Sequence, residues 1–170
     1  LLAAGVSLED LIAAGVDTDK LIALGFTQEA INRAAQGICT AATAKMYKSQ
    51  GLTAKEVKQK GCSAAVMKEA GFTAAELKEA GFSAMQLKEA GFSAKELLAA
   101  GYNAQSLKAA GFSAADLIDA GVSLADLKAA GFSAGELKEA GISAEALLAA
   151  GYSASNLADA GFSVEEMIAA

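Results

Sequence analysis

The sequence predicts an all-α solenoid of about sixteen short, two-turn helices in ten-residue repeats. Three observations support this fold class. Glycines recur at ten-residue steps from Gly51 to Gly161, and Gly5, Gly15 and Gly25 keep the same period. Most of these glycines are followed, two residues later, by a Ser, Thr, Asn or Asp that suits a helix N-cap. The residues that come next are mainly Ala, Leu, Lys and Glu, which are strong helix formers.

We expect a single repeat solenoid over the whole chain, divided into three parts: first repeats at residues 1–25, irregular longer helices at 26–50, and regular decapeptide repeats at 51–170. The chain begins in mid-repeat and stops just before the next glycine would be due. We therefore interpret it as a piece of a longer or processed protein.

One repeat, residues 82–91, shows why a helix forms and where it ends. Ser83 is predicted to cap the first turn, and Gln86 stands three residues later, where it completes a capping box. Gly91 is predicted at the C′ position, where a left-handed residue ends the helix without a Cβ penalty. Further capping boxes are expected at Thr53/Glu56, Thr73/Glu76, Ser93/Glu96, Ser113/Asp116, Ser123/Asp126 and Ser133/Glu136.

The aromatic residue between glycine and cap explains the tight period. Phe82 is placed to pack against Leu77 of the preceding helix and Leu87 of the following one. The predicted caps of the sixteen helices are Ser7, Asp17, Thr27, Thr40, Thr53, Ser63, Thr73, Ser83, Ser93, Asn103, Ser113, Ser123, Ser133, Ser143, Ser153 and Ser163.

The ten-residue period breaks over residues 26–50. Two longer helices are predicted there, at about residues 28–36 and 41–50, and Met46 and Tyr47 add bulky side chains to the second. We favour a phase correction between two stretches of solenoid, and the alternative is a docking site at this bend.

A pentapeptide-repeat β-helix is the alternative fold, because large apolar residues also recur every five residues. That fold needs a small residue two places before each central Leu or Phe. Several repeats instead hold a long or charged residue there: Met85, Lys95, Gln105 and Glu145. Strand formers are scarce as well, so helices are favoured.

The phrase Gly-Phe-Ser-Ala-x-Glu-Leu-Lys-x-Ala resembles the Ala-Gly-Phe/Tyr-Ser decapeptide arrays of large proteins from single-celled eukaryotes. The resemblance covers residues 51–170 closely and residues 1–25 more loosely. It implies a repeat architecture and carries over no catalytic or binding residue.

Composition excludes several function classes. The net charge of −6 argues against a nucleic-acid partner, whose phosphates need a basic surface. No run of residues has the length and apolar character of a transmembrane segment. The chain has no His, which is the usual general base and the commonest metal ligand. We therefore expect no enzyme activity and no cofactor. Cys39 and Cys62 match no metal-binding spacing.

We expect the two cysteines to be buried thiols, with a structural disulfide as the alternative. We favour an intracellular location, in the cytoplasm or in an organelle.

The position after the central Leu supplies the candidate partner surface. It is Lys in most repeats, and we interpret this row as a solvated face. Where the position is apolar, either the core widens locally or a partner binds. The candidate surface residues are Leu98, Ile118, Leu148, Ile168, Met46 and Tyr47.

Two functions fit these observations. The first is a structural or scaffolding solenoid that binds other proteins. The second is an accessory or linker subunit of a larger assembly, including one that is membrane-embedded or cofactor-bearing. An apolar row that is exposed in the free protein favours the second, and a buried row favours the first.

Overall fold

In the computed structural model, residues 6–35 and 38–170 are described, and they form sixteen helices and no strand. The all-α prediction is therefore confirmed, and the β-helix alternative is wrong for these residues. Gly5, which belongs to the predicted repeat pattern, lies outside the described residues.

The chain forms two compact units, Leu1–Gly91 and Phe92–Ala170. The N-terminal unit contains α1 (Leu8–Ala13), α2 (Thr18–Ala23), α3 (Gln28–Ala34), α4 (Ala41–Ser49), α5 (Ala54–Gln59), α6 (Ala64–Glu69), α7 (Ala74–Glu79) and α8 (Ala84–Glu89). The C-terminal unit contains α9 (Ala94–Ala99), α10 (Ala104–Ala109), α11 (Ala114–Asp119), α12 (Leu124–Ala129), α13 (Ala134–Glu139), α14 (Ala144–Ala149), α15 (Ala154–Asp159) and α16 (Val164–Ile168). That the whole array is one solenoid stays a prediction.

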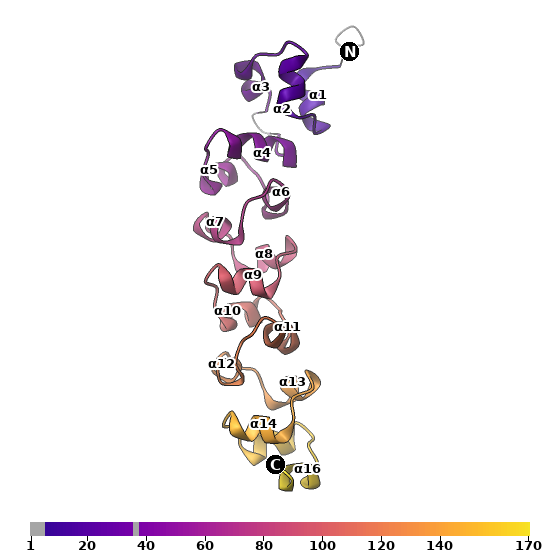
Figure 1. Cartoon of the computed structure of the whole chain (residues 1–170), viewed down its shortest axis with the longest axis vertical. Helices are drawn as coiled ribbons and strands as arrows, with labels where there is room; N and C mark the ends of the chain where they lie inside the picture. The colour runs from indigo at the N-terminus through magenta and orange to yellow at the C-terminus, as the bar shows by residue number, and fades with distance from the viewer. Residues whose placement is uncertain (1–5, 36–37) are drawn as a thin grey trace. The chain divides into compact units, whose positions relative to one another are not determined.

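Helices pack mainly on the second helix along the chain. In the N-terminal unit, α4 packs on α6, α6 on α8, and α5 on α7. In the C-terminal unit, α9 packs on α11, α13 on α15, and α10 on α12. Helix α11 packs on α13, which lies below it in Figure 1. Two helices therefore complete one turn in each of these stretches, and one turn takes twenty residues.

All sixteen predicted N-cap positions are occupied as expected, and fifteen cap side chains accept a backbone N–H three residues on. Asp17 makes no such bond. Six of the seven expected capping boxes are complete. Asp126 accepts a bond from the Ser123 hydroxyl at 2.6 Å but none from its backbone N–H, so that box is incomplete.

The predicted longer helices are slightly shorter than expected. The first ends at Ala34 rather than residue 36, and the second ends at Ser49 rather than residue 50. The second still has nine residues, so it gains about one turn over the six-residue helices of the regular repeats.

The end of α12 illustrates how the regular helices stop. The N–H of Gly131 donates to the Lys128 carbonyl at 2.9 Å, and the N–H of Phe132 donates to the Leu127 carbonyl at 3.0 Å. These are the two hydrogen bonds of a Schellman motif, with Gly131 at C′ and φ of 86°. The aromatic residue that follows is thereby held at the helix end.

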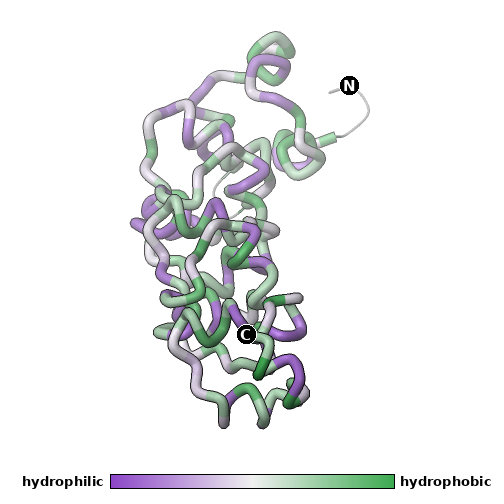
Figure 2. The backbone as a smooth tube through the Cα atoms, turned by 60° about the horizontal axis from the view of Figure 1, so that its bottom comes forward, coloured by the Kyte–Doolittle hydropathy of each residue, from purple (hydrophilic) through white to green (hydrophobic). Residues whose placement is uncertain are grey.

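The core is a row of central leucines. Leu77 and Leu87 in the N-terminal unit, and Leu107, Leu127 and Leu157 in the other, are among the fully buried side chains. Apolar and polar residues alternate along every repeat, so the coloured tube changes from green to purple in short steps (Figure 2). Burying the apolar side of each short helix supplies stability that its length alone does not.

Two glycines of one repeat are expected to respond to alanine with opposite signs. Gly131→Ala should lower the free energy of unfolding by about 1 kcal/mol, because a Cβ is penalised at positive φ. Gly135 lies inside α13 with helical backbone, and an added Cβ would meet its nearest atom, Ser133 Oγ, only at 3.8 Å. Gly135→Ala should therefore raise stability by about 0.5–1 kcal/mol. Urea unfolding of both variants checks this, and a shared sign would contradict the assigned backbone.

Candidate functional site

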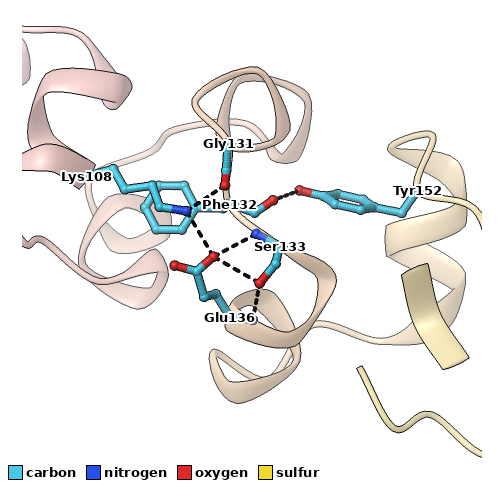
Figure 3. Close-up of polar contacts among 6 residues, drawn as sticks. All are labelled: Lys108, Gly131, Phe132, Ser133, Glu136 and Tyr152. Atoms are coloured by element: carbon cyan, nitrogen blue, oxygen red, sulfur yellow. Dashed lines mark hydrogen bonds and ion pairs between the residues drawn. The ribbon is translucent and has the colours of Figure 1, made fainter. Parts of the chain in front are cut away.

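The lysines after the central leucines do not form a fully solvated row. The ammonium of Lys108, in α10, donates to the carbonyl of Gly131 at 2.5 Å and to Glu136 Oε2 at 2.9 Å. It also lies 4.3 Å from the centre of the Phe132 ring (Figure 3). Lys108 thereby contacts the end of a helix two repeats further along. Five of the seven lysines in this row are half-buried and two, Lys78 and Lys128, are exposed, so the interpretation of the row as a solvated face holds only in part.

We call this arrangement the lysine–glycine contact, because a lysine ammonium binds the carbonyl of a glycine 23 residues later. It recurs for Lys48 with Gly71 at 2.6 Å and for Lys58 with Gly81 at 2.9 Å. The other pairs are Lys68 with Gly91, Lys128 with Gly151 and Lys138 with Gly161. These glycines follow the last helical residues, so the lysines satisfy carbonyls near helix C-termini and complement the helix dipole.

Replacing Lys108 by methionine should lower the free energy of unfolding by about 1–2 kcal/mol, because a charge-assisted hydrogen bond and a cation–π contact are lost while the aliphatic stem is kept. Lys95→Met, at an exposed position of α9, is the matched control and should have little effect. Denaturant unfolding measures both. Equal effects would show that the lysine–glycine contact contributes no stability.

Lysine and aromatic residues are coupled in the sequence at a fixed interval. From residue 72 onward, each Phe or Tyr at the aromatic position has Lys 24 residues before it: Lys48/Phe72, Lys58/Phe82, Lys68/Phe92, Lys78/Tyr102, Lys88/Phe112, Lys108/Phe132, Lys128/Tyr152 and Lys138/Phe162. Val122 and Ile142 are the aliphatic exceptions, and Leu98 and Ile118 precede them by the same interval. A lysine gains a cation–π contact only where an aromatic residue is present, and in this sequence the two occur together.

Carboxylates at the third helical position belong to the same network. Hydrogen bonds from the Ser133 backbone and from Lys108 hold the pKa of Glu136 below its ordinary value of 4.5, although burial opposes this. For Glu76, burial acts to raise the pKa, but bonds from Thr73 and Lys48 outweigh it. Hydrogen bonds from their own cap residues likewise lower the pKa of Asp10, Glu56 and Glu166.

Acid should destabilise the protein through these groups. A carboxylate whose pKa is lower in the folded state contributes stability above its unfolded pKa, and this is lost as the pH falls through the folded pKa. The free energy of unfolding should therefore be level near neutral pH and decline below about pH 5. In Glu136→Gln the decline should be smaller, since Gln86 shows that glutamine completes the same capping box. Rising stability on acidification would contradict this network.

The structure places two of the six candidate surface residues in the core. Met46 is 5 % exposed and Tyr47 is 3 % exposed. The Tyr47 hydroxyl donates to the Ala35 carbonyl at 3.0 Å, and burial raises the pKa of that hydroxyl. These bulky residues fill the extra volume next to α3, so including them in a partner surface is wrong.

The other four candidates are accessible to different degrees. Leu98, Ile118 and Leu148 are half-buried, as is Lys108 at the equivalent position of α10. Ile168, in α16, is 80 % exposed. The three half-buried side chains therefore lie at the margin of the core, and their outer atoms remain available to a partner.

The two cysteines form a disulfide, so the expectation of two buried thiols is wrong. Cys39 lies just before the cap of α4, and Cys62 takes the aromatic position before α6, with their Cα atoms 5.2 Å apart. Their separation of 23 residues equals the interval of the lysine–glycine contacts. The bond thus joins the irregular segment to the regular repeats, and the shared interval is the signal that sequence reasoning missed.

A cleft of about 580 Å³ lies beside Leu98 in the C-terminal unit. We call it the Leu98 cleft, and its lining includes Asn103, Gly121, Val122, Asp126 and Ala129. It lies where Val122 replaces the usual aromatic ring and Leu98 replaces the usual lysine. Sequence reasoning singled out Leu98 but not the cleft, because Val122 lies 24 residues away.

The described residues contain neither a metal-binding cluster nor a membrane-spanning helix. Their His, Cys, Asp and Glu side chains form no group of three or more placed to hold a metal ion. None of the helices in residues 6–35 and 38–170 reaches the length and apolar character of a membrane-spanning helix.

Stacked two-turn helices with a shared ten-residue period define the protein as a helical repeat array. The family model of the decapeptide repeat region matches residues 41–114 and 101–170. These matches cover more than half of the chain, which therefore belongs to the decapeptide repeat family. No curated protein and no solved structure matches the chain.

Proposed function

We propose that the chain is a non-catalytic scaffold that binds other proteins within a larger assembly. One observation carries this proposal. The recurring polar side chains are used inside the array, as helix caps, capping-box carboxylates and lysine–glycine contacts. Such a use of polar groups supports a structural role, because it builds a regular framework that presents its outer faces to partners.

The partner surface that we propose consists of Leu98, Ile118 and Leu148, with Ile168 as a further exposed apolar residue. The first three place apolar side chains where most repeats have lysine. Their half-buried state supports a self-sufficient scaffold over an accessory subunit, because an accessory subunit would leave this row exposed when free.

The disulfide helps to choose between the cellular compartments expected for this protein. Disulfides persist in oxidising environments and are rare in the reducing cytosol. Of the two intracellular locations expected, an organelle lumen therefore fits the Cys39–Cys62 bond better than the cytoplasm.

Affinity capture from native material, using the tagged chain, tests the proposal. The variant Leu98→Lys/Ile118→Lys/Leu148→Lys should lose partners that the wild type retains, with folding nearly unchanged. The control Ala99→Lys/Ala109→Lys/Ala149→Lys adds the same charge at neighbouring exposed positions and should retain them.

Unaltered capture by the first variant would rule out this surface, and a large loss of thermal stability would show that the three side chains belong to the core. The absence of any specific partner of the wild type would overturn the scaffold function itself.

A further inference from the structure

The Leu98 cleft lies at the position where most other repeats have a lysine side chain. One repeat further along, a lysine occupies the equivalent position: the Lys108 ammonium binds the Gly131 carbonyl and the Glu136 carboxylate. In the Leu98 cleft the corresponding residues are Gly121 and Asp126, and the residue 23 positions before Gly121 is Leu98. Leucine cannot donate a hydrogen bond, so the two acceptors lack the cation that the repeat otherwise supplies.

Both acceptors are available. Within the described part of the chain, the Gly121 carbonyl accepts no hydrogen bond. Asp126 accepts a bond from the Ser123 hydroxyl but pairs with no lysine or arginine of the described residues. Gly121 and Asp126 both line the cleft, and a glycine carbonyl and an acidic side chain are the kinds of acceptor that Lys108 uses.

A second repeat that lacks the lysine does not keep the acidic residue. Ile118 also replaces lysine, and Ile142 replaces the aromatic residue 24 positions later. There, however, the third helical position is Ala146, so the acid is absent as well. The repeat of Leu98 keeps Asp126 at that position, although Asp126 does not complete a capping box.

We propose that the Leu98 cleft binds the side chain of a lysine from a partner protein. The aliphatic stem lies against the apolar wall of Leu98, Val122 and Ala129, and the ammonium group binds the Gly121 carbonyl and the Asp126 carboxylate. Residues 101–170 hold three Lys against nine acidic residues, so the surrounding charge also attracts a cation. Only the source of the lysine rests on the proposed function, because ammonium binding is a property of the chain itself.

Titration of the ¹⁵N-labelled chain with capped lysine (Nα-acetyl-lysine methylamide), followed by amide chemical shifts, tests this binding. The amides of Asn103, Gly121, Val122 and Asp126 should shift in a saturable way. The Nε-acetyl derivative and the norleucine analogue should produce at least about tenfold weaker binding, because they cannot form the charge-assisted bonds.

Three variants test the assignment of the site. Leu98→Lys supplies the missing ammonium from within the chain and should abolish binding of capped lysine. Leu24→Lys makes the same substitution at an exposed leucine of the N-terminal unit, outside the cleft and outside the proposed partner surface, and should leave binding unchanged. Asp126→Asn should weaken binding by about tenfold, because a charged acceptor is replaced by a neutral one.

Equal shifts in wild type and Leu98→Lys, or shifts centred outside these four residues, would overturn the assignment. Saturable binding of spermidine without binding of capped lysine would contradict a lysine of a partner protein as the ligand and would favour a free polyamine. If capped lysine binds and the partner capture described above nevertheless fails, the cleft stands and the scaffold function does not.

Discussion

Replacing Phe132 by alanine is expected to lower the free energy of unfolding of the C-terminal unit by about 3–5 kcal/mol. Phe132 is 3 % exposed, and its ring lies under the Lys108 ammonium at 4.3 Å. Its carbonyl accepts a hydrogen bond from the Tyr152 hydroxyl at 2.6 Å (Figure 3). This single substitution therefore removes buried apolar area, leaves a cavity and deprives Lys108 of its aromatic partner.

Urea unfolding followed by circular dichroism measures this loss. Val164→Ala is the control, because Val164 is 61 % exposed and its truncation should change stability by about 0.5 kcal/mol or less. Phe132→Val, which copies the residue at position 122, should have an intermediate effect. A Phe132→Ala variant as stable as the control would show that the aromatic residue does not hold successive helices together.

Removing the disulfide is expected to destabilise the N-terminal unit by about 3 kcal/mol, because the bond closes a chain segment with a sequence separation of 23 residues. The variant Cys39→Ser/Cys62→Ser should show this loss in denaturant unfolding. Reducing agent should destabilise the wild type to a similar extent and leave the double variant unaffected. Mass spectrometry of non-reduced protein that detects two free thiols would contradict the bond itself.

Helix positions were predictable because their signals are local. Ser133 and Glu136 are three residues apart, and the C′ glycine at Gly131 directly precedes the aromatic residue, so caps and ends follow from short phrases. The lysine–glycine contacts and the disulfide were not predictable in this way. Both join residues 23 positions apart, and this interval depends on how many helices complete one turn. The sequence period alone leaves that number open.

The candidate surface was predictable only in part for the same reason. Leu98 and Ile118 depart visibly from the local pattern, so they stand out in the sequence. Their partners at Val122 and Ile142 become evident only once the two-repeat stacking is known. Met46 and Tyr47 were misassigned because the break in period gives no local sign of whether bulky residues point inward or outward.

Nuclear Overhauser effects in the C-terminal unit test the central claim, which is that six-residue helices stack on the second helix along the chain. Methyl labelling of leucine should reveal effects between α10 and α12 and between α11 and α13, together with helical carbon shifts in all four segments. Extended-chain shifts in these segments, or effects confined to consecutive helices, would contradict the account.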